Sequence, residues 1–301
     1  MKKAFINRSS KVFLCLLASI LILPACGPSG QRQEAAEEDS AVERLEAAAE
    51  DSAVERLEAA AEESAGEWIR LFNGEDLQGW TIKIAKHPLG ENYNQTFRAE
   101  EGKLVTRYEM YEDFDGEYGH IYYKDPYSHY KLRLEYRVVG EQVKGGQGWA
   151  LKNSGVMFHA QSPESMGLNQ DFPVSLEAQF LGGTGEGERP TGNLCTPGTH
   201  VMIDGELVTQ HCTNSTSETY HGEEWVRFEL VVHGDSIIHH IVNGDTVLTY
   251  SQPRIGGDLP DEFPLDEGTP LQSGYIALQA ESHPYEFRNI ELLDLSPSGT
   301  P

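Results

Sequence analysis

The sequence predicts an all-β fold, a two-sheet sandwich or jelly roll, over residues 68–295. Apolar and polar residues alternate in several segments, as in strands with one buried face: 131–138, 226–232 and 273–280. Asn243-Gly244 separates two further such segments, and this dipeptide is typical of a two-residue hairpin turn. No long amphipathic helical pattern follows residue 68, and many short strands with glycine turns favour a sandwich or jelly roll.

The first 25 residues have the layout of a cleavable secretory signal. Basic residues precede an apolar stretch at 12–23, which is shorter than the roughly 20 residues of a membrane span. The stretch ends in Leu23-Pro24-Ala25-Cys26-Gly27, which resembles the lipobox of bacterial lipoproteins. The resemblance implies cleavage before Cys26, a lipid on Cys26, and attachment to the bacterial cell envelope (outer membrane, cell surface or periplasm). The alternative is an ordinary signal cleaved near Ala25, with Cys26 incidental.

Residues 26–67 are predicted to form an acidic tether between the lipid and the β domain. The twelve residues DSAVERLEAAAE occur at 39–50 and again at 51–62. Ala, Glu, Leu and Arg favour helix, but alanine dominates the apolar content, so the segment reads as a semi-rigid, partly helical or disordered spacer. A short coiled coil is the alternative, and residues 296–301 are a tail.

Composition narrows the classes of ligand. The formal net charge is −25, and no basic patch suggests nucleic-acid binding. An acidic, exported chain suits a neutral ligand, and calcium is conceivable.

Of the four cysteines, Cys15 leaves with the signal and Cys26 carries lipid. In an oxidising compartment, Cys195 and Cys212 are predicted to form a disulfide rather than two free thiols, worth roughly 3 kcal/mol for a loop of about 15 residues.

Strand alternation sorts polar side chains onto one face. In 173–181, Glu177 and Gln179 lie opposite the apolar set, and in 154–159 His159 shares a face with Met157. In 275–281, Gln279 and Glu281 fall on one face in the same way. Several strands could thus each contribute a polar group to one carbohydrate cleft. Any single strand glutamate is more often simply a surface residue.

Six motifs in order resemble the 3-keto-disaccharide hydrolase domain family over residues 68–295: Leu71–Trp80, Lys152–Met157, Ser175–Gln179, His240–Gly244, Gly274–Gln279 and Phe287–Ile290. The resemblance implies a concanavalin A-like jelly roll. It also implies action on an oxidised (3-keto) glucoside or disaccharide, and a partner oxidoreductase that makes the keto-sugar. The 3-keto group acidifies the proton on C2, so a base can remove it, the C1 oxygen leaves by elimination, and water adds back.

The resemblance suggests a role for each candidate residue. Glu177 is expected to be the base or a metal-linked carboxylate, His240 its acid/base counterpart, and Glu281 a second carboxylate or metal ligand. Gln179 and Gln279 are expected to hold sugar hydroxyls, with His159, Asn153 and Arg288 as further substrate contacts. Arg288 could instead brace the last strand. A divalent cation could stabilise the enediolate, although no residue spacing demands one.

The sequence departs from the family where many members carry an Asp-His pair: Ala280-Glu281-Ser282-His283 stands there. Two other functions remain open. A non-catalytic carbohydrate-binding module would use Trp80, Trp149, Tyr220 or Trp225 as stacking platforms, although aromatic residues of this kind more often pack in a core. A conventional glycosidase needs two carboxylates, and position 179 beside Glu177 is a glutamine.

Overall fold

A computed structural model describes residues 66–296. The predicted signal, the lipidation site Cys26 and nearly all of the tether lie outside the described residues, as do residues 297–301. Within 66–296, no helix is long and apolar enough to cross a membrane.

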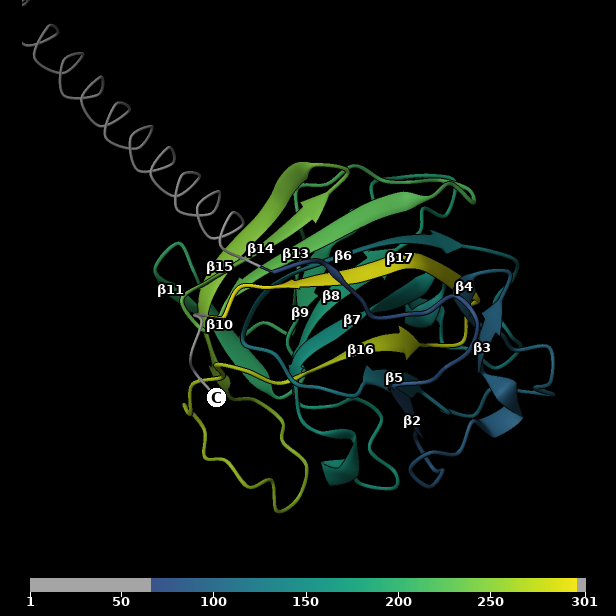
Figure 1. Ribbon diagram of the computed structural model, residues 1–301, viewed down its shortest axis with the longest axis horizontal. Coiled ribbons are helices and arrows are strands. Elements are labelled where there is room, and N and C mark those ends of the chain that lie inside the picture. The colour runs from purple at the N-terminus through teal and green to yellow at the C-terminus, as the bar shows by residue number, and fades with distance from the viewer. Residues whose placement is uncertain (1–65, 297–301) are drawn as a thin grey trace, which may run out of the picture. The chain divides into compact units, whose positions relative to one another are not determined.

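Seventeen strands form two antiparallel sheets (Figure 1). The ten-stranded sheet runs β11-β10-β15-β14-β13-β6-β17-β4-β3, with β1 paired to β17. It comprises β1 (Ile69–Arg70), β3 (Phe97–Glu100), β4 (Lys103–Thr106), β6 (His129–Val138), β10 (Thr199–Ile203), β11 (Glu206–Val208), β13 (Val226–His233), β14 (Ile237–Val242), β15 (Asp245–Ile255) and β17 (Tyr285–Asp294). The predicted all-β, jelly-roll class is therefore confirmed.

The seven-stranded sheet runs β12-β9-β8-β7-β16-β5-β2. Its strands are β2 (Trp80–Ile84), β5 (Gly119–Tyr123), β7 (Asn153–Ala160), β8 (Leu176–Leu181), β9 (Asn193–Cys195), β12 (Cys212–Thr213) and β16 (Tyr275–Ala280). Three 3₁₀ turns lie in the connections: η1 (Tyr93–Gln95), η2 (Gly148–Ala150) and η3 (Pro163–Ser165).

The predicted hairpin turn joins β14 to β15. Asn243 and Gly244 both have positive φ, 51° and 99°, the conformation that a two-residue turn needs to match strand twist. Strand β15 continues to Ile255, well beyond the hairpin, because it also pairs with β10 on its other edge.

The hydrophobic core lies between the two sheets. In β6 every second residue is buried, as the alternating pattern predicts, and β14 behaves in the same way. Tyr136 of β6 stacks on Phe180 of β8 with ring centroids 4.0 Å apart, which joins one sheet to the other. The apolar set predicted for 173–181 supplies Leu176, Ala178 and Phe180 to this core.

The face of the seven-stranded sheet turned away from this core is called the outer face below. One part of it is apolar, and Met166 in the loop after β7 covers that part by packing on Tyr122 and Met157. The Tyr122 hydroxyl donates a hydrogen bond to Met166 Sδ at 2.8 Å. The rest of the outer face carries polar side chains, and these form the candidate site.

Candidate active site

A row of polar residues crosses the outer face through neighbouring strands. His120 of β5 lies opposite Gln279 of β16, and the register of β16 on β7 brings Gln279 alongside Gly155. Gly155 in turn lies opposite Gln179 of β8, which lies opposite Asn193 of β9. Residues widely separated in sequence therefore share one row because side chains on paired strands point the same way at each register position.

The side chain of Glu177 leans across the gap that Gly155 leaves in this row. A Cβ at position 155 would lie 2.7 Å from Glu177 Oε1 and 3.0 Å from its Cγ. Such distances are far below van der Waals contact, so residue 155 must lack a side chain for Glu177 to adopt this position. The glycine thus directs the carboxylate from β8 toward β16.

Glu281 follows the last residue of β16 and forms an electrostatically coupled pair with Glu177. Burial raises the pKa of Glu177 to about 8. Burial also raises the pKa of Glu281 well above its usual range, and the negative charge of Glu177 raises it further. Two buried carboxylates that cannot both ionise easily share protons near neutral pH, which is how paired acids divide acid and base roles.

Several buried polar atoms around this pair have no hydrogen-bond partner in the protein. They include both ring nitrogens of His120, both amide atoms of Gln279, Asn153 Oδ1, and one carboxylate oxygen each of Glu177 and Glu281. Buried polar groups in folded proteins are nearly always paired, so a cluster of unpaired ones marks a place where a ligand completes the bonding.

The histidines of the cluster are uncharged at neutral pH. Burial, with a smaller contribution from the Lys83 ammonium, lowers the pKa of His120 to about 3. Burial likewise lowers the pKa of His283 to about 4. The Lys83 ammonium is itself held by the carbonyl oxygens of Ile84, His87 and Leu168, at 2.9, 3.2 and 3.2 Å. A neutral His120 can donate one hydrogen bond to an electron-rich oxygen.

Aromatic residues flank one side of the cluster. Trp149, in the turn η2, is 53 % exposed and stacks on Tyr118 with centroids 5.6 Å apart. Phe172 packs on Tyr118 at 5.0 Å and edge-on to His120 at 6.0 Å. The pKa of Tyr118 is raised to about 12, by burial and then by the nearby charge of Glu281. An exposed aromatic face beside polar groups suits a sugar ring, which has both apolar and hydroxyl-bearing surfaces.

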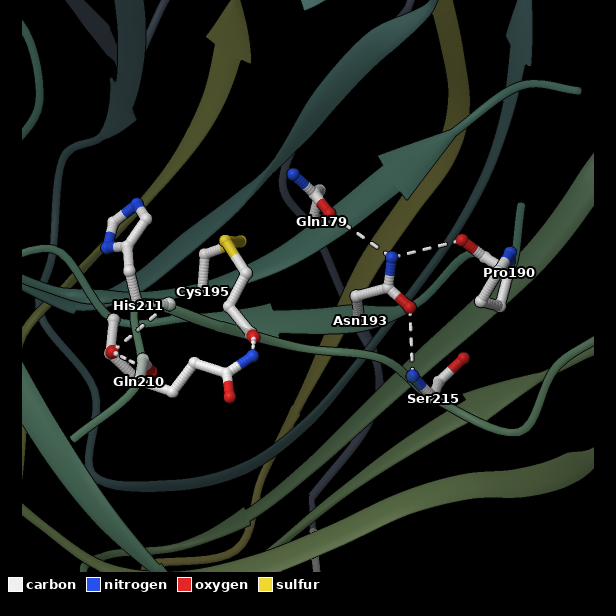
Figure 2. Close-up of a disulfide and its surroundings, with 9 residues drawn as sticks. Gln179, Pro190, Asn193, Cys195, Gln210, His211 and Ser215 are labelled. Atoms are coloured by element: carbon white, nitrogen blue, oxygen red, sulfur yellow. Dashed lines mark hydrogen bonds between the residues drawn. A yellow bond between two sulfur atoms is a disulfide. The ribbon is translucent and has the colours of Figure 1, made fainter. Parts of the chain in front are cut away.

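The predicted disulfide between Cys195 and Cys212 is present, and it ties β9 to β12 beside the row (Figure 2). Cys195 is also the register partner of Glu177. Two residues before it, the Asn193 amide donates to Gln179 Oε1 at 3.1 Å and to the Pro190 carbonyl at 3.0 Å (Figure 2). Gln179 is thereby oriented, with its own amide nitrogen left for other partners.

Five of the predicted site residues come together on the outer face: Asn153, Glu177, Gln179, Gln279 and Glu281. Sequence reasoning missed His120 and His283. Alternation within 119–123 could have found His120, because Ile121 is in the core and its neighbours point the other way.

The placement of His240 corrects its prediction as the acid/base counterpart of Glu177. It lies on β14 of the other sheet, is fully buried, and packs edge-on to Phe158 and Phe228. Its Nδ1 donates to the Gly192 carbonyl and its Nε2 accepts from the Tyr250 hydroxyl, both at 2.8 Å. Burial lowers its pKa to about 4. In the alternating strand β14, His240 shares a face with Ile238 and Val242, and that face is buried in the core.

His159 and Arg288 also lie away from the cluster. A register shift in the β7–β16 pairing and a φ of 46° interrupt alternation at His159, and its Nε2 donates to the Gly234 carbonyl at 3.0 Å. Arg288, on the ten-stranded sheet, pairs with Glu135 and stacks over Trp225 at 4.0 Å. Arg288 thus braces β17 against β6, the structural alternative stated above.

Glu177 and Glu281, the two carboxylates predicted as possible metal ligands, are not joined by a third ligand residue in the described part of the chain. Within residues 66–296, no group of three or more His, Cys, Asp or Glu side chains is arranged to hold a metal ion.

The comparison with known families identifies the class of this domain, which is carbohydrate-active and glycosyl hydrolase-like. The chain belongs to the 3-keto-alpha-glucoside-1,2-lyase-like domain family, whose profile matches residues 67–293. Among curated proteins, none matches the sequence.

Solved structures similar to this chain include a proposed glycosyl hydrolase from Parabacteroides distasonis. It is 19 % identical, with 76 % of this chain and 100 % of that chain covered and a TM-score of 0.46. A Bacillus subtilis protein with a galectin-like fold is 11 % identical, with 76 % and 97 % covered and a TM-score of 0.42.

Proposed function

We propose that the chain cleaves 3-keto-glycosides by elimination and hydration, with Glu177 as base and Glu281 as acid. The observation that carries this proposal is the coupled, buried carboxylate pair in a cluster of unpaired neutral polar groups. Proton abstraction next to a ketone needs a base of raised pKa, and departure of the C1 oxygen needs a proton donor close by.

The steps balance as follows. Glu177 takes the proton from C2, and the C2–H electron pair forms a C2=C3 bond while the ketone becomes an enolate oxygen. The enolate then restores C3=O, a C1=C2 bond forms, and the C1–O bond breaks as its oxygen takes the proton from Glu281. Water then adds across C1=C2, which gives net hydrolysis.

The assignment of base and acid follows from the two environments. The charge of Glu177 adds to burial in raising the pKa of Glu281, so Glu281 keeps its proton when Glu177 has lost one. His120 and Gln279, neutral and unpaired, are the hydrogen-bond donors proposed for the enolate oxygen. Asn153 and Gln179 are proposed to hold sugar hydroxyls, and Trp149 to stack on the ring.

A conventional glycosidase is the second candidate, because the two carboxylates predicted from the sequence, Glu177 and Glu281, influence each other's charge in the folded chain. Glu177 and Glu281 come from different strands, and two carboxylates flanking a glycosidic bond are the usual catalytic set of such enzymes. Of the four predicted stacking platforms, Trp149 alone supports a binding module. Trp80 donates its Nε1–H to the Leu71 carbonyl, and Trp225 lies under Arg137 and Arg288. Tyr220 packs against the core, and its hydroxyl accepts a hydrogen bond from Asn243.

The deciding experiment gives the purified chain a 3-keto-glucoside and, separately, the ordinary glucoside, with and without EDTA. Release of the aglycone from the keto form alone supports the elimination. Release from the ordinary glucoside makes the chain a conventional glycosidase, and release from neither leaves the binding module. Loss of release with EDTA would add a divalent cation to the mechanism.

Matched variants then test the base. Glu177→Gln should lower kcat by about 10²- to 10⁴-fold, the usual contribution of a general base, while substrate affinity is retained. Glu224→Gln, at an exposed position just before β13 of the ten-stranded sheet, is the control and should leave kcat unchanged. Equal kcat for both variants would remove Glu177 from the mechanism.

We also propose, on the sequence alone, that Cys26 is lipidated and holds the mature chain at the cell envelope. Cys26→Ala should move the protein from the membrane fraction to the soluble fraction. The substrate chemistry further requires an oxidation of the sugar C3 hydroxyl upstream, so an oxidoreductase is the expected functional partner.

A further inference from the structure

One buried serine, Ser282, stands between two residues of the carboxylate cluster and has no role in the mechanism above. It follows Glu281 and precedes His283, in the short connection where the chain leaves β16 of the seven-stranded sheet for β17 of the ten-stranded sheet. Glu281 and His283 are each 2 % exposed, and both carry polar atoms without a partner. The conformation of Ser282 therefore decides where the carboxylate before it and the imidazole after it lie.

The backbone of Ser282 is strained. Its φ of 83° is the largest positive value of any non-glycine residue in 66–296, and it matches those of Gly74 and Gly79, 83° and 84°. This left-handed region crowds the Cβ of an L-residue, so glycine normally occupies it. Ser282 is also fully buried, unlike a residue in a surface turn. Strain of this kind persists only where the surrounding structure holds it, and it is concentrated at functional sites.

Three hydrogen bonds hold Ser282 in this conformation. Its N–H donates to the Tyr108 hydroxyl at 2.8 Å, and its carbonyl accepts from the Val143 N–H at 3.0 Å. Its hydroxyl oxygen accepts from Gln142 Nε2 at 2.9 Å. The first two bonds use only backbone atoms of residue 282, so a glycine could make them without strain. The third bond requires the serine hydroxyl.

The hydroxyl connects Ser282 to the turn that carries Trp149. Gln142 Nε2, which donates to Ser282 Oγ, also donates to the Gln147 carbonyl at 2.8 Å. That carbonyl begins the turn η2, because it also accepts from the Ala150 N–H at 3.0 Å. Trp149, proposed above to stack on the sugar ring, lies in this turn. The Gln142 side chain therefore bridges the residue beside Glu281 and the turn that presents the aromatic ring.

The fold leaves room for this bridge at Gly146. A Cβ at residue 146 would lie 2.6 Å from Ser282 Oγ and 2.7 Å from Gln142 Nε2. Both distances are far below van der Waals contact, so any side chain there would displace the bridge. Gly146 does not have a positive φ, and its backbone conformation is therefore open to other residues. The close approach of the bridge is the physical reason for a glycine at this position.

We propose that Ser282 is a positioning residue, which fixes Glu281 beside Glu177 and couples it to the Trp149 turn. Its left-handed backbone directs Glu281 to the outer face, and its hydroxyl holds η2 in place through Gln142. The strain of a serine at φ 83° is retained because glycine, which would relieve it, cannot make the bridge. The inference rests on the proposed function for the role of Glu281 as acid, whereas the placement of Glu281 can be measured without turnover.

The kinetic test removes the hydroxyl and the strain together. Ser282→Gly adopts the left-handed backbone freely, so the variant folds, but it loses the bond from Gln142. With a 3-keto-glucoside, kcat should fall about ten- to a hundredfold because Glu281 is no longer held in its productive position. KM should rise about three- to tenfold, the effect of one lost hydrogen bond at the turn that carries Trp149.

A double-mutant cycle then tests the bridge itself. Gln142→Ala breaks the same bond from its other end and should raise KM by a similar factor. The double variant of Ser282→Gly and Gln142→Ala should have the KM of Ser282→Gly, because both changes act through one bond. Ser236→Gly, which removes an exposed hydroxyl bonded to the His233 carbonyl, is the matched control and should change neither constant. Unchanged constants in Ser282→Gly, or effects on KM that multiply in the double variant, overturn the proposal.

A titration separates this inference from the proposed function. The carboxyl resonances of Glu177 and Glu281 are followed by NMR as pH is varied, and Glu177→Gln and Glu281→Gln assign them. In the wild type, burial and the charge of Glu177 raise the pKa of Glu281 well above its usual range. In Ser282→Gly this pKa should fall toward its ordinary value, because the carboxylate leaves its buried place beside Glu177. That result supports the positioning role even if no keto-glycoside is cleaved, and an equal pKa in both chains overturns it even if the keto-glycoside is cleaved.

Discussion

Replacing Glu177 by Gln should alter how the stability of the domain depends on pH. Burial raises the pKa of Glu177 to about 8 in the folded chain, against 4.5 as its ordinary value. Between these values the folded state keeps a proton that the unfolded state has released. The free energy of unfolding therefore falls as pH rises through this range, and Glu177 contributes nothing to the slope below about pH 4.5.

The buried histidines also titrate, and they determine the pH range in which the contribution of Glu177 to stability can be measured separately. Burial lowers the pKa of four histidines to about 3 or 4, namely His120, His159, His240 and His283. Between about pH 4 and 6.5 the unfolded chain therefore binds more protons at these residues than the folded chain does, and the free energy of unfolding rises with pH. Their effect opposes that of Glu177 there and ends near pH 6.5. From pH 6.5 to 8, one proton at about 1.4 kcal/mol per pH unit amounts to about 2 kcal/mol.

The assay is urea denaturation of both chains at pH 6.5, 7, 7.5 and 8. The unfolding free energy of Glu177→Gln minus that of the wild type should increase by about 2 kcal/mol over this range, since the amide cannot titrate. Glu224→Gln should follow the wild type at every pH. A Glu177→Gln curve that stays a constant distance from the wild type would refute the raised pKa, and with it the base assignment.

Three further predictions follow from the packing. Gly155→Ala should displace Glu177, which should lower kcat and reduce the free energy of unfolding, measured in urea, by about 1–3 kcal/mol. Gly167→Ala should change neither quantity, because a Cβ at residue 167 would make only ordinary contacts, at 3.7 Å or more. His240→Gln should lower Tm and leave kcat per folded molecule unchanged, whereas His120→Gln should lower kcat and leave Tm unchanged. The same pattern of changes in both variants would contradict the assignment of His240 to the core and His120 to the site. Replacing both disulfide cysteines by serine should cost roughly 3 kcal/mol of unfolding free energy, and an unchanged urea midpoint would count against it.

The sequence predicted the fold and one face of the site well because both depend on strand alternation. In the run around Glu177 and Gln179, the alternate residues Leu176, Ala178 and Phe180 lie in the core. In the run ending at Glu281, Ile276, Leu278 and Ala280 do the same. Alternation says which residues share a face, but not which of the two faces is the core. His240, whose role was predicted from the resemblance, lies on the face of β14 that is buried in the core.

Two other features were inaccessible to pattern reasoning. The interruption at His159 depends on a shift in strand pairing, which has no signature in residue type. The coupling of Glu177 to Glu281 depends on three strands being neighbours in the order β8-β7-β16, and on a glycine standing between the two acids. Strand order is a property of long-range pairing, so only the folded chain reveals it.

The positions of the arginine and lysine side chains explain why Glu177 and Glu281 have no cationic partner within residues 66–296. Glu286, on the ten-stranded sheet, contacts Arg107, Arg137 and Lys103, and although burial opposes it, hydrogen bonds from these three bring the pKa of Glu286 to about 2. Near the outer face, by contrast, Arg189 donates to backbone carbonyls, including Leu151 at 2.7 Å.

Lys83 likewise donates its hydrogen bonds to three carbonyl oxygens. Backbone carbonyls therefore hold the nearby cations without a carboxylate, and none of the described residues forms an ion pair with Glu177 or Glu281. The same residue type is thus a permanent anion on one sheet and a proton carrier on the other. A cation introduced beside the pair would lower both pKa values and remove the proton that elimination requires of Glu281.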